Sequence, residues 1–200
     1  IISGDGCMME GINYEAASLA GTLGLGKLIV LYDSNSITIE GSTDIAFTEN
    51  VCKRFEALGW ETFEVEDGND VESIEKAINK AKENKNKPSL IKITTEIGYG
   101  TSKQGKSSVH GSPLGEEDMA NLKKFLGWKE EEFTVPAEVR EHMAKLVEMG
   151  EKKEKAWEEK LEAYKKEYPE LAKELENWID LKLPMDYLNS EEFLQFDKNY

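Results

Sequence analysis

The sequence has few cysteines and histidines and no long apolar run. Its 200 residues include two cysteines and two histidines. Cys7 and Cys52 are too few for a disulfide framework, which favours a reducing compartment, so we expect a cytoplasmic protein. No apolar stretch is long enough to cross a membrane, and no leader that is basic and then apolar is visible. Because Ile1 and Ile2 already fall inside an expected strand, we expect the true N-terminus to lie elsewhere.

Basic residues are also scarce. The chain has 25 Lys and Arg against 40 Asp and Glu, which gives a formal charge of −15. This balance argues against nucleic acid and against an anionic membrane as partners. The overall field would repel an anionic ligand, so a metal ion or a helix N-terminus would have to hold it locally.

The chain is organised around Gly4-Asp5-Gly6, which follows the apolar pair Ile1-Ile2. A run with helical spacing from Ile12 to Leu23 comes next, and a second apolar run leads to a polar loop that contains Asn35. This pattern predicts a strand, a tight turn, a helix and a second strand. Both strands would end at the edge of an α/β sheet where ligands bind.

Asp5 and Asn35 lie thirty residues apart, and each follows an expected strand. A carboxylate, an amide oxygen, a main-chain carbonyl and two diphosphate oxygens would form a shell that suits Mg²⁺ or Ca²⁺ and does not suit zinc. The glycines beside Asp5 would let the backbone approach a bulky anion. A simpler interpretation also stays open, in which Asp5 stabilises a turn and Asn35 occupies a left-handed bend.

Two stretches resemble the transketolase family. The first is GDGCMMEGINYEAASLAGTLGLGKLIVLYDSNSITIEG, from Gly4 to Gly41, and the second is His-Gly-Ser-Pro-Leu-Gly, which begins at His110. The resemblance implies thiamine diphosphate as cofactor. It also implies a Mg²⁺ or Ca²⁺ ion bound by Asp5, Asn35 and the main chain of Ile37, and contact between the diphosphate and the backbone N–H of Gly6.

Three further residues acquire roles from this resemblance. His110 matches the histidine that contacts cofactor and substrate, although an isolated loop histidine is usually only solvent-exposed. Glu10 and Glu15 resemble the glutamates that link the paired active sites of a homodimer through carboxylates and water. Otherwise they are acids favoured near a helix N-terminus. Four small residues would let the same helix approach a symmetry mate closely, namely Ala16, Ala17, Ala20 and Gly21.

Beyond Gly41 the sequence alternates expected helices and strands. Helices are predicted at 49–58, capped by Thr48, and at 71–84, capped by Asp70, and strands at 60–66 and 89–95. The alternation predicts the α/β class, with a parallel sheet flanked by helices. The resemblance implies the thiamine-diphosphate-binding fold, incomplete at its N-terminus. A glycine-rich loop from Glu96 to Gly115 is expected at the edge that carries Asp5, followed by a helix at 116–126.

A long helical region is predicted from Pro136 to about Asp180, with a break at Tyr168 caused by Pro169. Apolar residues at spacings of three and four predict one seam packed on its own domain: Trp157, Leu161, Tyr164, Tyr168, Leu171, Leu175 and Trp178. We therefore divide the chain into a partial diphosphate-binding domain at 1–128, a helical extension at 129–182 and a linker at 183–200.

The resemblance implies an enzyme of the pentose phosphate pathway that transfers a two-carbon ketol unit from a ketose phosphate to an aldose phosphate. Other parts of the family's site are not found in these 200 residues. We therefore expect this chain to be inactive alone and to work with the remainder of a transketolase or a complementary subunit, as part of a homodimer. Two alternatives stay open: another thiamine-diphosphate enzyme, such as a formaldehyde transketolase or a deoxyxylulose-phosphate synthase, and a non-catalytic fragment.

Overall fold

The computed structural model describes residues 1–183, so nearly all of the expected linker at 183–200 lies outside the described residues. The chain separates into two compact units, Ile1–Lys129 and a second that begins at Glu130, and each is described by itself. The functional division at 128 and 182 stays a prediction. Of the helices in residues 1–183, none combines the length and the apolar character that a membrane crossing requires.

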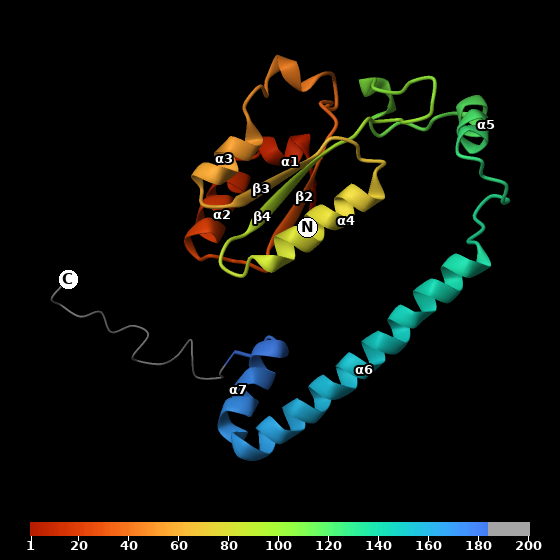
Figure 1. Cartoon of the computed structure of the whole chain (residues 1–200). Coiled ribbons are helices and arrows are strands. Elements are labelled where there is room, and N and C mark those ends of the chain that lie inside the picture. Colours follow the sequence, from red (N-terminus) through yellow and green to blue (C-terminus); the bar gives the residue numbers. More distant parts are fainter. Residues whose placement is uncertain (184–200) are drawn as a thin grey trace. The chain divides into compact units, whose positions relative to one another are not determined.

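A four-stranded parallel sheet forms the centre of the first unit (Figure 1), with the strand order β1-β2-β4-β3. The strands are β1 (Ile2–Gly4), β2 (Ile29–Ser34), β3 (Glu61–Val65) and β4 (Ser89–Thr94). Gly4 pairs with Asp33, and Ser34 pairs with Thr94, so β1, β2 and β4 end at one edge of the sheet. The predicted α/β class with a parallel, helix-flanked sheet is confirmed.

Helices cover both faces of this sheet (Figure 1). One face packs against α1 (Asp5–Met9), α2 (Gly11–Thr22) and α3 (Val51–Ala57), and the other packs against α4 (Val71–Glu83). Alternate residues of β2 serve the two faces, with Val30 and Tyr32 on the first and Ile29 and Leu31 on the second. The remaining elements of this unit are the 3₁₀ turns η1 (Thr43–Ile45) and η2 (Ser107–Val109) and the helix α5 (Glu116–Phe125).

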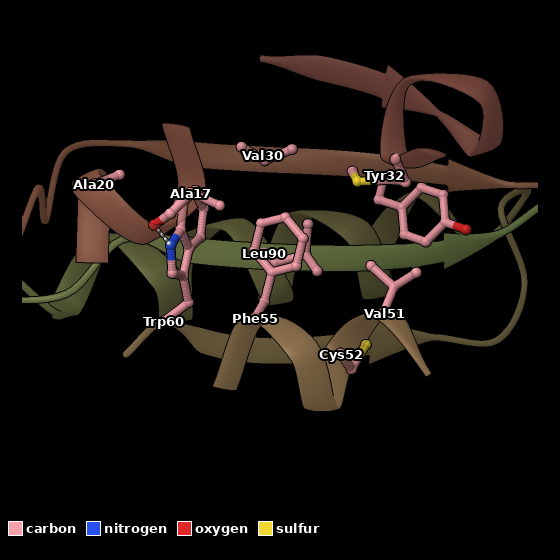
Figure 2. Packing of buried hydrophobic residues seen from close by; sticks show 10 residues of the cluster. Ala17, Ala20, Val30, Tyr32, Val51, Cys52, Phe55, Trp60 and Leu90 are labelled. Atoms are coloured by element: carbon pink, nitrogen blue, oxygen red, sulfur yellow. Dashed lines mark hydrogen bonds between the residues drawn. The ribbon is translucent and has the colours of Figure 1, made fainter. Parts of the chain in front are cut away.

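The core under α1, α2 and α3 is built around large aromatic side chains (Figure 2). Phe55 and Trp60 meet edge to face with ring centroids 4.9 Å apart. The Trp60 Nε1–H group donates to the main-chain oxygen of Ala17 at 2.8 Å, so this buried polar atom is satisfied. Burial also raises the pKa of the Cys52 thiol to about 11. The contacts of Trp60 with Ala17 and Phe55 hold α2 against the segment that contains α3 and β3.

The small residues of α2 pack inside their own unit. Ala17 and Ala20 are buried, and a Cβ atom on Gly21 would lie 1.8 Å from the carbonyl oxygen of Leu58. The prediction that these residues serve close approach to a symmetry mate is therefore wrong for these three, because they pack in the core of the same chain and approach Leu58 and Trp60, between α3 and β3. Of the larger apolar residues expected on this helix, Ile12 and Leu19 are exposed.

Helices α3 and α4 each begin after a residue whose side chain accepts a hydrogen bond from a backbone N–H group of the first turn. Asp70 caps α4 as predicted, since its carboxylate accepts from Ser73 N at 3.0 Å. The predicted cap at Thr48 is wrong. Asn50 caps α3 instead by accepting from Lys53 N at 2.9 Å, so the helix begins two residues later than expected. The expected turn at Gly4-Asp5-Gly6 is also replaced, because α1 already begins at Asp5.

In its described part, up to residue 183, the second unit contains α6 (Ala137–Glu167) and α7 (Pro169–Ile179), which pack against each other. The break at Tyr168 is confirmed, and Pro169 is the first residue of α7, where its missing N–H leaves no hydrogen bond unmade. Within this unit the seam is buried only in part, since Leu161, Tyr164 and Leu175 are half-buried whereas Trp157, Leu171 and Trp178 are exposed. Ala172 is buried as well. Packing of the seam on the diphosphate-binding domain stays a prediction.

A Gly21→Ala substitution tests the packing of α2. We expect it to lower the free energy of unfolding by about 3 kcal/mol, because the new methyl group would overlap the Leu58 carbonyl. Urea denaturation measures the change. Gly150→Ala in α6 is the matched control, since nothing lies within 4 Å of its added Cβ, and we expect it to stabilise by about 1 kcal/mol. Equal effects of the two substitutions would contradict the packing described here.

Candidate functional site

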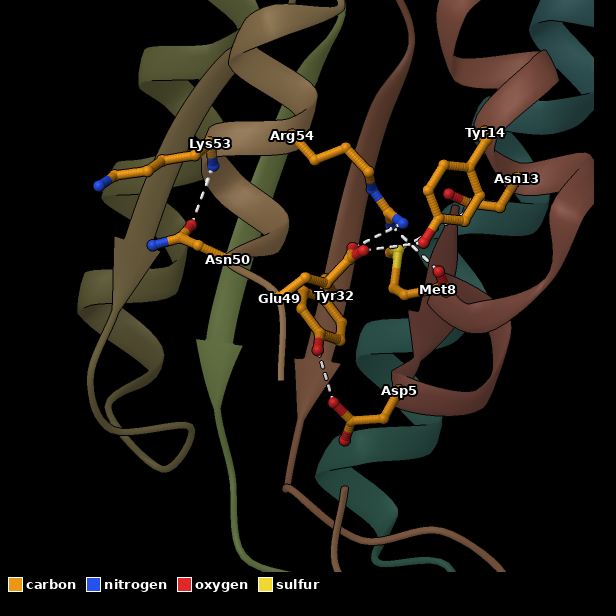
Figure 3. A network of polar contacts seen from close by, with 9 residues as sticks. All are labelled: Asp5, Met8, Asn13, Tyr14, Tyr32, Glu49, Asn50, Lys53 and Arg54. Carbon is orange, nitrogen blue, oxygen red and sulfur yellow. Dashed lines mark hydrogen bonds and ion pairs between the residues drawn. The ribbon is translucent and has the colours of Figure 1, made fainter. Parts of the chain in front are cut away.

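The Asp5 carboxylate joins the two strand ends at the centre of the site. Asp5 follows β1 directly and is buried. The hydroxyl of Tyr32 donates to Oδ1 at 2.5 Å (Figure 3), and the backbone N–H groups of Asn35 and Ser36 both donate to Oδ2 at 3.0 Å. The segment that follows β1 therefore meets the loop that follows β2, although thirty residues separate them.

The loop after β2 is tightly bent. The side-chain oxygen of Asn35 accepts a hydrogen bond from Ile37 N at 2.9 Å. The left-handed position in this bend is Ser36, with φ of 60°, and not Asn35 as the simpler interpretation held. Such a conformation is unfavourable for a residue other than glycine and is found mostly where the surrounding contacts enforce it. The Asn35 amide oxygen has a second lone pair, which leaves it able to bind a further partner.

A hollow of about 670 Å³ lies beside these two segments. Most of the candidate residues line it, and they come from α1, from the loop after β2 and from the glycine-rich loop: Asp5, Gly6, Glu10, Asn35, Ile37 and His110. Glu15 is the exception, because it lies exposed on α2 outside the set of lining residues. The structure thus brings six of the seven candidates together.

The charges around the hollow are acidic. Asp5, Glu10 and Glu40 line it, and among the described lining residues there is no Lys or Arg. An anion such as a diphosphate could bind here only with a cation that offsets these carboxylates. Within residues 1–183 no three His, Cys, Asp or Glu side chains gather as a metal cluster. A cation would therefore need mixed ligands, which the Asp5 carboxylate and the Asn35 amide provide.

Gly4 and Gly6 also fit a bound ligand. A Cβ atom added at either position would meet nothing within 4 Å, and neither residue has a positive φ. Neither packing nor backbone conformation within the described residues therefore requires glycine there. Both line the hollow, where the absence of a side chain leaves the backbone accessible to a large anion.

His110 is presented by a loop that is anchored to α5. The N–H and hydroxyl groups of Ser102 donate to the Asp118 carboxylate at 3.1 and 2.9 Å. These hydrogen bonds, the backbone one first, lower the pKa of Asp118. Tyr99 packs edge to face on Phe125, with centroids 5.5 Å apart. The long loop therefore has fixed attachments, and His110 lies exposed at its end beside the hollow.

Comparison with known proteins places most of the chain in one family model. The family model described as the thiamine diphosphate binding domain of transketolase matches residues 1–184. The chain belongs to the transketolase family. This confirms the family that the two motifs indicated.

Similar proteins cover the chain almost completely. The transketolase of Bacillus subtilis is 53% identical over 189 residues, which are 93% of this chain and 28% of that protein. Among solved structures, the transketolase of Leishmania mexicana superposes with a TM-score of 0.85 at 44% identity, and a Pichia stipitis transketolase in complex with fructose 6-phosphate superposes with 0.83 at 46%. Each solved match covers 92% of this chain and 28% of the other chain. The chain thus spans little more than a quarter of these relatives' length.

A second polar cluster of this transketolase-family chain, which the sequence did not reveal, lies among α1, α2 and α3 (Figure 3). Arg54 of α3 donates to the main-chain oxygen of Met8 at 3.1 Å and pairs with Glu49 at 2.6 Å. Its guanidinium group lies 3.8 Å from the ring centroid of Tyr14. The Tyr14 hydroxyl donates to Glu49 at 2.8 Å, and this bond raises the pKa of Tyr14. Arg54 therefore ties α1 to α2 and α3.

Replacing Arg54 by lysine tests whether this cluster depends on the guanidinium group. We expect Arg54→Lys to lower the free energy of unfolding by about 2 kcal/mol, because an ammonium group cannot stack on Tyr14 and bind Glu49 and Met8 together. Urea denaturation measures the change. Lys53→Met is the control, since the side chain of Lys53 is exposed, and an equal loss there would contradict the expectation.

Proposed function

We propose that this chain supplies the metal and diphosphate site of a transketolase, which transfers a two-carbon ketol unit from a ketose phosphate to an aldose phosphate. The observation that carries the proposal is the meeting of Asp5 with the Asn35 loop at one sheet edge. The family to which the chain belongs supports it. Because the chain spans 28% of its relatives, we propose that activity requires further portions of a transketolase.

The residues present suit the cofactor. Asp5, Asn35 and the main chain of Ile37 would hold Mg²⁺ or Ca²⁺, and the ion would bind the diphosphate. The N–H group of Gly6 would donate to the diphosphate, which its open position allows. Bound thiamine diphosphate supplies the ring carbon that accepts the ketol unit. The protein's task in this part of the chain is therefore to hold an anion in an acidic hollow.

His110, Glu10 and Glu15 are proposed to handle protons and hydrogen bonds. His110 lies at the hollow with its ring exposed, where it would bind substrate hydroxyl groups and exchange a proton with them. Glu10 lines the same hollow. Glu15 lies outside it, so its role would require a second subunit, in agreement with the proposed homodimer.

The proposed partners follow from the same site. Sugar phosphates are the proposed substrates, and a Pichia stipitis relative was solved with fructose 6-phosphate and also with sedoheptulose 7-phosphate. The acidic balance of the chain gives no support to nucleic acid or an anionic membrane as a partner. We propose a place in the pentose phosphate pathway and a cytoplasmic location.

Asp5→Asn tests the metal site. In the longest natural polypeptide that contains this sequence, we expect the affinity for thiamine diphosphate in the presence of Mg²⁺ to fall about 100-fold, because the charged ligand is lost while the side-chain size is kept. Isothermal titration calorimetry measures the affinity. Asp44→Asn removes an exposed carboxylate of η1, which follows β2, and serves as control. Unchanged affinity in Asp5→Asn would remove the basis of the proposal.

His110→Ala tests the role of the glycine-rich loop. In the same polypeptide we expect turnover of a ketose phosphate with an aldose phosphate to fall about 100-fold, with a weaker apparent affinity for sugar phosphate, because an acid–base or hydrogen-bonding group is lost. Steady-state kinetics measures both quantities. His142→Ala is the matched control, since this other histidine is exposed on α6. Normal kinetics in His110→Ala would return His110 to an ordinary exposed residue.

A further inference from the structure

The hydroxyl of Tyr32 touches the central carboxylate of the site, and neither the motifs nor the family match assigns it a role. We propose that Tyr32 is a positioning residue that fixes the orientation in which Asp5 presents Oδ1 to the divalent ion. This inference rests on the proposed function, because it concerns the same metal site. It adds a residue whose effect passes through Asp5, with no contact of its own to the ion.

The hydrogen bonds of Asp5 show which of its two oxygens remains able to bind the ion. An ionised carboxylate has about four lone-pair positions, two on each oxygen. Both positions on Oδ2 are occupied by the N–H groups of Asn35 and Ser36. One position on Oδ1 is occupied by the hydroxyl of Tyr32. A single position therefore remains, on Oδ1, so Asp5 would bind the ion through one oxygen.

Tyr32 is well suited to hold that orientation. Its side chain is 2% exposed and belongs to the core cluster that also contains Met8 and Phe55, so the ring has little freedom to move. The hydroxyl lies 2.5 Å from Oδ1 of a carboxylate that accepts hydrogen bonds, so it is placed to donate to Asp5.

The Asp5 side chain needs such an anchor because the torsion that rotates a carboxylate about its Cβ–Cγ bond has broad, weakly defined minima. The two backbone donors hold Oδ2 alone. Without the Tyr32 hydroxyl, Oδ1 would lose the contact that fixes the plane of the Asp5 carboxylate. Partners of a metal ligand typically change metal affinity by about 10-fold to 100-fold when they are removed.

The test compares Tyr32→Phe with the parent in the longest natural polypeptide that contains this sequence, in the presence of excess thiamine diphosphate. Electron paramagnetic resonance of free Mn²⁺ gives the dissociation constant of the ion. We expect this constant to rise about 10-fold in Tyr32→Phe. Replacement of Tyr32 by 4-aminophenylalanine, which keeps a donor at the same ring position, should restore most of the affinity. Thermal melting without metal shows whether each variant is folded.

Tyr14→Phe is the matched control, because it removes another phenol that donates to a carboxylate, 2.8 Å from Glu49, and should leave Mn²⁺ binding unchanged. An unchanged constant in Tyr32→Phe, a variant that does not fold, or failure of 4-aminophenylalanine to restore affinity would each overturn the inference.

The Asp5→Asn variant separates failure of this inference from failure of the proposed function. If Asp5→Asn abolishes Mn²⁺ binding while Tyr32→Phe retains it, only the role of Tyr32 is wrong. If the parent binds no Mn²⁺, or Asp5→Asn leaves binding intact, the metal site itself is wrong.

Discussion

The hydrogen bonds that Asp5 accepts from the end of β2 connect the fold of this chain to its site. A buried carboxylate is stable only when its oxygens find donors, and here Tyr32, Asn35 and Ser36 provide them. The parallel pairing of Gly4 with Asp33 brings these groups within reach. The register of β1 on β2 therefore brings Asp5 to its donors and places Asp5 and Asn35 together in the lining of the hollow.

Several features were predictable from the sequence because the signal for each was local. The apolar runs and glycines marked the strands and turns, and the parallel topology followed from the alternation with helices. Asp70 and Pro169 act on their own neighbours in sequence, as a cap and as a helix breaker, so their effects were readable. The meeting of Asp5 with the Asn35 loop was predictable because each follows an apolar run that ends at the same sheet edge.

Features that depend on contacts between distant segments were not predictable in the same way. Arg54 reaches Met8 across 46 positions, and Tyr32 reaches Asp5 across 27. Helical spacing identified the small residues of α2 without showing that Gly21 faces Leu58 of the same chain. Periodicity indicates which face of an element is apolar or small, but the partner of that face is determined by tertiary packing. The same limit applies to the predicted seam across Pro169, since spacing does not show what covers Leu171 and Trp178, which are exposed within their own unit.

The acidic character of the chain bears directly on how its ligands would bind. The hollow is lined by Asp5, Glu10 and Glu40, and the formal charge of the chain is −15. These carboxylates would repel one another and would also repel a diphosphate. The cation would reduce the repulsion between the carboxylates and the diphosphate, and the diphosphate would complete the oxygen shell of the cation. By thermodynamic linkage, each ligand would then strengthen the other's binding by the same factor. A site of this composition would therefore select the metal–diphosphate pair over either ligand alone.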